Sequence, residues 1–264
     1  MDTMADIRQS AAYAKFIRSI GWRVVQCQGL GAKCYVFIRP LGLLGAIAKI
    51  QRVDKNPDWK ELNKILKKNR VWMTKLEPGT WHLAPSTFHQ DGWPLLASKT
   101  LRIDLKKIKP KKDCRYCIRK ARSTKHEIRK NSFGEFYKLW KKAAGIKRLW
   151  IPPEKDYLSL INVFGGNAFC ITIDSLAGAV VLIHQKTAYY YYAAALPEAK
   201  KLYLPYLVVW ELLKEAKKRG CKIWDWEGIY DERWPNKGWK GFTHFKKSFG
   251  GYEIEFPGSF TRWF

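Results

Sequence analysis

Acidic residues are scarce in this 264-residue sequence: 23 Asp and Glu stand against 49 Lys and Arg, which gives a formal net charge of +26. Folding does not need such an excess, and its field attracts polyanions such as nucleic acids, phosphorylated ligands or an anionic membrane surface. The alternative is a solvated basic surface that keeps the protein soluble. Hydrophobic residues make up 47% of the chain, so we expect a globular protein with one large domain or two small ones.

Long apolar runs are also missing. The opening stretch, MDTMADIRQSAAYAKFIRSIG, carries charges throughout and lacks the apolar core of a signal peptide. The most apolar run, PLGLLGAIAKI from Pro40, is too short and too rich in glycine to span a bilayer. We therefore expect a cytoplasmic protein, for which peripheral contact with the inner membrane face stays open.

Signatures of metal sites and covalent catalysis are absent as well. Of six scattered cysteines only Cys114 and Cys117 have a metal-like spacing, and no second CxxC or HxxxH accompanies them. We interpret them as reduced cysteines on one helix face. No Ser-His-Asp or Cys-His spacing, P-loop or GxGxxG stands out, so we expect no metal and no cofactor. That leaves substrate positioning and electrostatic stabilisation as the expected chemistry.

The first part of the chain predicts a small α/β or α+β lobe. An amphipathic helix is expected over the first 20 residues, ending at Gly21. The turn signal GLGA separates the first two expected strands, and a loop is expected from Pro78 to Lys99. The expected strands and the second helix (residues 57–69) are, in order, WRVVQCQ, KCYVFIR, GAIAKIQRV, PDWKELNKILKKN, VWMTKLE and TLRIDL.

The second half has a more regular pattern. The expected elements are, in order, FGEFYKLWKKAAG, EKDYLSLINVFG, NAFCITI, AGAVVLIH, TAYYYYAAA, LYLPYLVVWELLKEAKKRG, CKIWDWEG, KGFTHFKKSFG and YEIEF. This order of two helices, three antiparallel strands, helix, strand, helix and strand resembles the GNAT type of N-acyltransferase fold. We expect a mixed α+β protein of two GNAT-like lobes, a compressed one over residues 1–105 and a second over 106–264. The last strand is a candidate to return to the first lobe.

A basic segment lies between Arg102 and Lys130, with 13 Lys or Arg and three acids. Part of it is expected to be helical, so that Arg115, Arg119 and Arg122 project together, beside Lys120. Such crowding of like charges is tolerable if a polyanion is the partner. A solvated helix face is the alternative.

The run of four tyrosines is the first candidate for a substrate pocket. In a regular strand Tyr190 and Tyr192 point to one side, and Tyr189 and Tyr191 point to the other. Four consecutive phenols cannot all be buried without partners, so one pair could line a pocket with hydroxyl groups. One buried pair and one surface pair is the alternative.

Two carboxylates end the expected strand WDWEG. Asp225 and Glu227 are two residues apart and should share one face, at the strand end where α/β folds place ligands. They could bind an amine substrate, or hold Lys240 or Lys246 in place.

The next segment is expected to be a helix opened by Gly241, whose unpaired N–H groups could meet an oxyanion. Lys246 follows about one and a half turns later, with Lys247 beside it, and could project toward the same group. His244 should point elsewhere.

Together these segments resemble the Fem (FemABX-like) aminoacyltransferases, which build the interpeptide bridge of bacterial peptidoglycan. The segments that carry the resemblance, in the family's order, are RQSAAYAKFIRSIGW, STFHQDGWPLLASKTLRIDL, RYCIRKA, AYYYYAAA, LPYLVVWELLKEAKKRGC, DWEGI and KGFTHFKKSFGG. The likeness covers nearly the whole chain and is most specific from Tyr189 to Gly251.

The resemblance implies two GNAT-like lobes around a cleft, in a monomeric enzyme. The donor would be aminoacyl-tRNA and the acceptor a muropeptide precursor, either UDP-linked or lipid-linked. The resemblance places Lys246, preceded by Phe245, at the ester carbonyl, where an ammonium group would stabilise developing negative charge. It places Tyr190 and Tyr192 in the acceptor pocket. The basic helix from Arg115 to Arg122, with Lys247, would suit tRNA phosphates.

The chain also departs from the family pattern: it is short, lacks a coiled-coil arm, and has no clear copy of the family's usual arginine around LWKKAAGIKRLW. Two other functions stay open. A GNAT enzyme using acyl-CoA would need a glycine-rich loop before the long helix, where this chain has EAKKLYLPYLVVW. A non-catalytic protein that binds RNA or a lipid surface would suit the charge but leaves DWEG and GFTHFKKSFGG unexplained.

Overall fold

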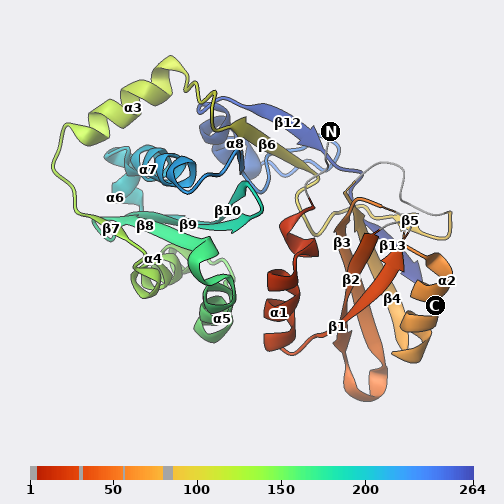
Figure 1. The fold of residues 1–264 in the computed structure, drawn as a ribbon. Coiled ribbons are helices and arrows are strands. Elements are labelled where there is room, and N and C mark those ends of the chain that lie inside the picture. Colours follow the sequence, from red (N-terminus) through yellow and green to blue (C-terminus); the bar gives the residue numbers. More distant parts are fainter. Residues whose placement is uncertain (1–4, 30–31, 56, 80–85) are drawn as a thin grey trace. The chain divides into compact units, whose positions relative to one another are not determined.

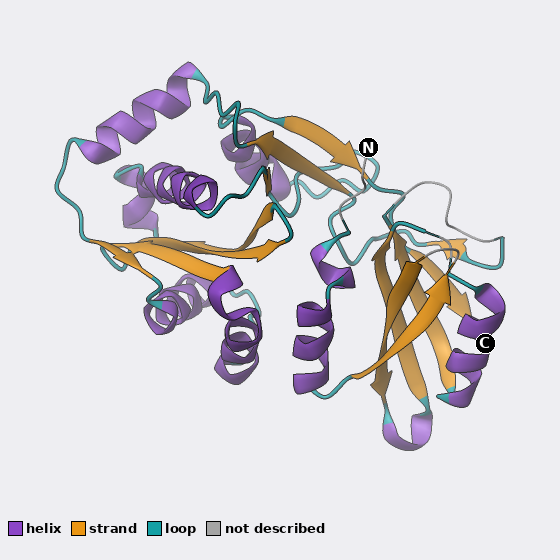
Figure 2. Cartoon of the chain, in the orientation of Figure 1, coloured by secondary structure: helices purple, strands orange, loops and turns teal. Residues whose placement is uncertain are grey.

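The computed structural model describes residues 5–29, 32–55, 57–79 and 86–264. The chain divides into two compact units. Unit 1 comprises Met1–Lys99, Asp231–Asn236 and Glu255–Phe264, and unit 2 comprises Thr100–Tyr230 and Lys237–Ile254. Helices and strands are mixed in both units (Figure 2), as predicted for a mixed α+β protein. No helix in the described residues is long and apolar enough to cross a membrane.

Unit 1 is built on a mixed sheet whose described strands follow the order β1-β2-β3-β4-β13-β5. The strands are β1 (Arg23–Gly29), β2 (Ala32–Pro40), β3 (Ala46–Val53), β4 (Val71–Pro78), β5 (His89–Gln90) and β13 (Phe260–Trp263). β3 and β4 are parallel, and the other neighbours are antiparallel. The centre of the predicted GLGA turn and residues 80–85 of the predicted loop lie outside the described residues.

Helices cover both faces of this sheet (Figure 1). On one face lie η1 (Ile7–Gln9) and α1 (Ala11–Ser19), and on the other lies α2 (Trp59–Lys68). The Tyr13 ring of α1 lies 5.7 Å from that of Phe37 in β2. Leu62 and Leu66 of α2 belong to an apolar cluster that also contains Val36 and Ile38 of β2. Successive side chains of a strand point to opposite faces, so these two residues face α2 while Phe37, between them, faces α1.

The single helix predicted over the first 20 residues is wrong. Ser10 has extended backbone angles, φ −91° and ψ 152°, and its side chain accepts a hydrogen bond from the backbone N–H of Tyr13. Serine in this conformation is a favourable helix N-cap, so α1 begins at Ala11 and a separate 3₁₀ turn precedes it.

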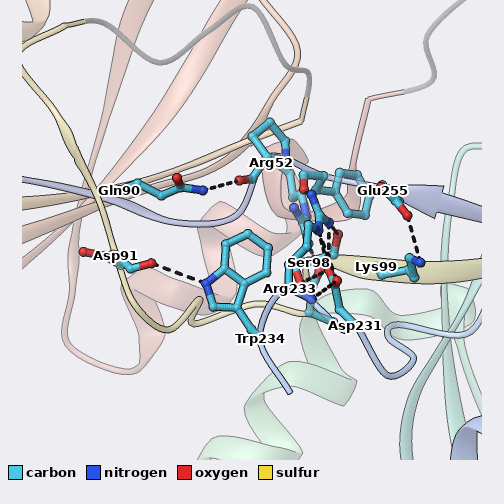
Figure 3. Close-up of polar contacts among 12 residues, drawn as sticks. Arg52, Gln90, Asp91, Ser98, Lys99, Asp231, Arg233, Trp234 and Glu255 are labelled. Carbon is cyan, nitrogen blue, oxygen red and sulfur yellow. Dashed lines mark hydrogen bonds and ion pairs between the residues drawn. The ribbon is translucent and has the colours of Figure 1, made fainter. Parts of the chain in front are cut away.

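The segment Asp231–Asn236 is held in unit 1 by an ion pair whose carboxylate is buried (Figure 3). The Asp231 carboxylate accepts hydrogen bonds from the Arg233 guanidinium, at 2.7 Å from Nη2, and from the Ser98 hydroxyl, at 2.6 Å. The Arg233 Nη2 also donates to the backbone carbonyls of Ser98 and Phe256. One side chain therefore joins three segments that are far apart in the sequence.

Unit 2 is built on a second mixed sheet, with its described strands in the order β12-β6-β11-β10-β9-β8-β7. They are β6 (Lys99–Asp104), β7 (Ile128–Lys130), β8 (Ala168–Ile173), β9 (Ala177–His184), β10 (Thr187–Ala195), β11 (Ile223–Asp225) and β12 (Tyr252–Glu255). The helices are α3 (Lys112–Arg122), α4 (Phe133–Ile146), α5 (Glu154–Phe164), η3 (Gly165–Asn167), α6 (Pro197–Lys201), α7 (Leu204–Lys218) and α8 (Trp239–Lys247).

The element order predicted for a GNAT-like lobe is the order observed in unit 2. α7 packs on one face of the sheet, with α3 packed on α7, and α4 and α5 lie on the other face (Figure 1). The long helix ends before Gly220, whose φ of +78° suits a helix C-terminus. The predicted strand YEIEF forms β12 in this sheet, whereas β13, which the sequence pattern did not predict, joins the sheet of unit 1.

Candidate active site

A pocket of about 680 Å³ lies within unit 2. β10 and β11 pair in parallel only from Thr187 to Tyr189, after which β11 ends while β10 continues to Ala195. The pocket is lined by this continuing part of β10, by α4 and α7, and by α8. In the described residues no strand pairs with this edge of β10 beyond Tyr189, an arrangement that suits a substrate with amide groups.

Lys246 lies behind the α8 wall of this pocket. Its side chain is buried, and Nζ donates hydrogen bonds to the backbone carbonyls of Trp226, at 2.9 Å, and Gly228, at 2.6 Å. Nζ also lies 4.9 Å from the ring centre of Phe242 and 6.0 Å from that of Tyr190, and both of these residues line the pocket. An ammonium group has three protons, and these two hydrogen bonds use two of them.

The surroundings of Lys246 lower its pKa to about 8. The cause is burial, which disfavours the charged form, while the nearby carboxylates of Glu227 and Asp225 act in the opposite direction. The side chain is therefore mostly protonated at neutral pH. A cation held in an aromatic, poorly solvated site is suited to stabilise an oxyanion.

The prediction that Tyr190 and Tyr192 share one face is wrong. Tyr190 pairs with Val181 and Tyr192 with Val180 of β9, so Tyr191 is an extra residue in β10. A β-bulge of this kind interrupts the alternation of side chains, and the residues on either side of it point to opposite faces.

The tyrosine rings accordingly have different surroundings. The ring of Tyr190 lines the pocket, and its centre lies 5.1 Å from that of the Trp226 ring. Burial raises the pKa of Tyr190, so its phenol is neutral. Tyr192 packs on the α4 and α5 side, 4.3 Å from Trp140, and does not line the pocket itself. Tyr189 is buried.

The two predicted carboxylates are also not equivalent. The strand expected to run through Glu227 ends at Asp225, and Glu227 has a left-handed φ of +58°, so the two side chains do not share a strand face. The Asp225 carboxylate is bound by the Thr100 hydroxyl and by Arg102 Nε, both at 2.7 Å. Asp225 therefore holds β6 and β11 together, and its contact with Lys246 is electrostatic.

The helix predicted to open at Gly241 instead begins two residues earlier, at Trp239. Gly241 lies in the first turn of α8 and lines the pocket. Phe245 also lines the pocket, and its ring centre lies 4.8 Å from that of Tyr206 in α7. Lys240 lies over the Tyr230 ring, with Nζ 5.2 Å from its centre.

Gly241 offers a direct test of the pocket. A Cβ atom added there would meet no heavy atom within 4 Å, so a larger side chain would extend into open space. We expect Gly241→Ala to stabilise the protein slightly, by up to about 0.5 kcal/mol, because alanine has less backbone freedom to lose than glycine and Gly241 lies in the first turn of α8. Gly241→Trp should leave the fold intact and lower substrate binding by about tenfold or more, measured by titration. Gly134→Trp, at an equally open position in α4, is the control.

The basic residues predicted to face tRNA are accessible. Arg115, Arg119, Lys120 and Arg122 are exposed on α3, although Arg122 also pairs with Glu211 of α7 at 2.7 Å. Lys247 is partly exposed and pairs with Glu253. These residues can meet an extended anion.

The cysteines carry no sign of a metal site. Cys114 is buried and Cys117 partly buried on α3, and both are reduced. Across the described residues, no group of three or more His, Cys, Asp or Glu is placed to hold a metal ion.

Several pocket residues were not predicted from the sequence. The segment LWKKAAGIKRLW contributes Trp140, Lys147, Leu149 and Trp150, and α6 contributes Lys200. The sequence analysis considered this segment only because it has no clear copy of the family's usual arginine. Its aromatic and apolar residues form no motif that predicts a pocket. They lie on α4 and the loop after it, and only the fold brings them to β10.

The start of α7 is poor in free N–H groups. Pro205 has none, Tyr206 N–H donates to the Tyr203 carbonyl at 3.0 Å, and Tyr203 N–H donates to the Lys200 carbonyl at 3.1 Å. A pyrophosphate group needs a cluster of such donors. The structure therefore offers little of the cradle that an acyl-CoA enzyme would use here.

Comparison with known proteins gives a family model that matches part of the chain, and a shared fold. Residues 172–263 match the model described as the FemAB family, a range that holds β10, Asp225, Glu227 and all of α8. No curated protein matches the sequence.

The solved structures that resemble the chain do so at low identity. The crystal structure of FemX has a TM-score of 0.77 at 14% identity, and the match covers 99% of this chain and 93% of FemX. The C-terminal domain of a putative lysylphosphatidylglycerol synthetase from Agrobacterium fabrum gives 0.61 at 11%, covering 97% and 87%. L-PGS from Bacillus licheniformis gives 0.62 at 10%, covering 98% and 92%. These likenesses establish a shared fold.

Proposed function

We propose that this Fem-family protein of GNAT-like fold is an aminoacyltransferase that adds an amino acid to the stem peptide of a peptidoglycan precursor. The donor in this proposal is aminoacyl-tRNA, no further cofactor takes part, and the protein acts as a monomer in the cytoplasm. The observation that carries the proposal is the buried Lys246 ammonium group behind a pocket walled by the FemAB-matched segment.

In the proposed reaction, the acceptor amine attacks the ester carbonyl carbon of the donor. The carbonyl oxygen gains negative charge, and the remaining N–H of Lys246 donates a hydrogen bond to it. The C–O ester bond then breaks, the ribose oxygen leaves with the proton that the amine loses, and the new amide remains on the stem peptide. Lys246 stays protonated throughout, and the pocket holds the reacting groups in place.

The charge of the protein supports a tRNA donor over a small one. The net charge is +26, and α3 presents Arg115, Arg119, Lys120 and Arg122 to solvent. Lys147 and Lys200 lie in the pocket wall and suit a phosphodiester next to the aminoacylated 3′ end of the tRNA. The scarcity of N–H donors at the start of α7 argues against acyl-CoA.

A transfer assay tests the proposal. Purified protein is incubated with a pool of radiolabelled aminoacyl-tRNAs and with UDP-linked muropeptide, lipid-linked muropeptide or phosphatidylglycerol as separate acceptors. Acetyl-CoA with the muropeptides forms a parallel reaction. We expect label to pass from tRNA to a stem peptide, which would also identify the amino acid. Label on phosphatidylglycerol alone, acetyl transfer alone, or tRNA binding without transfer would each contradict the proposal.

A further inference from the structure

The turn between β2 and β3 exposes apolar side chains at the edge of unit 1. η2 (Gly42–Leu44) forms this turn, and Leu43 is 93% and Leu44 77% exposed. The turn is fixed by a 2.8 Å hydrogen bond from Leu41 N–H to the Gly45 carbonyl. Gly45 has a φ of +84° and packs so close to the Arg70 backbone that a Cβ atom would lie 2.6 Å from its carbonyl oxygen. The leucines are thus held outward by a well-defined turn.

Aromatic side chains lie at the same end of the sheet. Ala46, the first residue of β3, pairs with Val71, the first residue of β4. Next to it, Trp72 stacks on Trp263 of β13, with ring centres 5.5 Å apart and planes 24° apart. Trp263 is 63% exposed. Exposed tryptophans beside exposed leucines form an apolar surface that a soluble monomer rarely carries without use.

The charges around this surface are all positive. The strand register brings residues 21–23, 38–46, 66–72 and 261–264 to this end of unit 1. These segments contain no Asp or Glu, and their basic residues are Arg23, Arg39, Lys67, Lys68, Arg70 and Arg262. Within the described ranges, the ion pairs found do not join any of the six to a carboxylate. Leu41, Leu43, Leu44, Trp72 and Trp263, with these six cations, are called the Leu43 patch.

We propose that the Leu43 patch docks unit 1 onto an anionic bilayer surface. Leu43 and Leu44 enter the interface, the two tryptophans lie at headgroup level, and the cations contact lipid phosphates. Nucleic acid would match the charge, but its phosphate backbone would not bury the two leucine side chains that are exposed to water. The proposal goes beyond the proposed transfer reaction and does not depend on it.

Vesicle flotation tests the docking with two pairs of variants. Leu43→Ser/Leu44→Ser removes the apolar tip, and Leu95→Ser/Leu202→Ser removes two exposed leucines elsewhere. Lys67→Glu/Lys68→Glu reverses two charges at the end of α2, and Lys217→Glu/Lys218→Glu reverses the matching pair at the end of α7. The vesicles contain phosphatidylcholine alone or with phosphatidylglycerol. Unfolding temperatures check that each variant is folded.

We expect the wild type to float with the anionic vesicles only, and both patch variants to lose about tenfold or more in affinity while the controls keep it. Docking is excluded if the wild type does not bind, if Leu43→Ser/Leu44→Ser binds normally, or if patch and control variants weaken equally. Loss of tRNA binding instead of vesicle binding in the patch variants would identify a nucleic-acid surface. Vesicle binding is scored without any transfer reaction, so it stands or falls separately from the proposed function.

Discussion

Lys246→Met is expected to lower the rate of aminoacyl transfer by about 10²–10³-fold, the usual cost of removing one donor from an oxyanion site. Methionine fills a similar volume but cannot donate a hydrogen bond or carry charge. The backbone carbonyls of Trp226 and Gly228 lose their partner, and the Phe242 ring loses the cation 4.9 Å from its centre. Single-turnover transfer from aminoacyl-tRNA measures the effect, and filter binding should give an unchanged tRNA affinity.

The control for this variant is Lys218→Met, which removes an exposed lysine from the last turn of α7. It should transfer at the wild-type rate. Near-wild-type turnover of Lys246→Met would remove Lys246 from the mechanism, and an equal loss in both variants would point to a general effect of charge on tRNA binding.

The pH dependence distinguishes two roles for the same lysine. Burial holds the pKa of Lys246 at about 8, so the ammonium form is lost as pH rises through that value. If the ammonium group stabilises the oxyanion, the transfer rate should fall as pH rises above 8, because Lys246 loses its proton. This fall is measured with the acceptor amine already deprotonated, so that the amine's own titration does not mask it. If the neutral amine acted as a base, the rate would instead rise through the same pH. Lys246→Met should lack either transition.

Arg233→Ala is expected to lower the free energy of unfolding by about 3 kcal/mol, because it leaves the buried Asp231 carboxylate without its cation. Arg18→Ala, which removes an exposed arginine from α1, should change stability by less than about 0.5 kcal/mol. Urea denaturation followed by circular dichroism measures both. The double variant Arg233→Ala/Asp231→Ala should recover part of the loss, since no unpaired charge remains.

The same ion pair makes a pH prediction. Burial by itself would raise the pKa of Asp231, but the hydrogen bonds from Arg233 and Ser98 outweigh it and hold the pKa below the ordinary value. A carboxyl group with a lowered pKa stabilises the fold above its unfolded pKa of about 3.8, and that contribution is lost as pH falls further. The stability gap between wild type and Arg233→Ala should therefore be constant near neutral pH and shrink as pH falls, first through the pKa of Asp231 in the variant, which burial raises, and then through its lowered pKa in the wild type. A gap independent of pH would show that Arg233 acts through packing alone.

Much of the fold was predictable because it rests on local periodicity. The helix predicted over 57–69 and the strands of the second half carry their own hydrophobic pattern, and α2 and β8 to β10 follow it within a few residues. β5 and β13 were missed since they are short and depend on pairing between distant segments. The N-cap at Ser10 was not predicted because it lies inside a continuous amphipathic pattern, which by itself indicates one helix over the first 20 residues.

The candidate site was less predictable, because its geometry depends on departures from regular structure. The alternation rule fails at Tyr191, where the bulge turns Tyr192 away from Tyr190. The sequence indicated that Asp225 could bind a substrate. In the structure its carboxylate accepts hydrogen bonds from Thr100 and Arg102, which lie more than 120 residues earlier in the chain. Lys246 was expected near an oxyanion both from its place on the helix and from the family resemblance, but no sequence rule gives its two carbonyl partners or its lowered pKa.

The position of β13 between β4 and β5 reverses the order in which the two units can form during synthesis. All residues of unit 2 have been translated once Ile254 is added, whereas the sheet of unit 1 still lacks an internal strand until Phe260–Trp263 emerge. Until then the edge of β4 is unpaired and open to wrong pairing. The unit that is translated first is therefore the last whose residues are all available for folding.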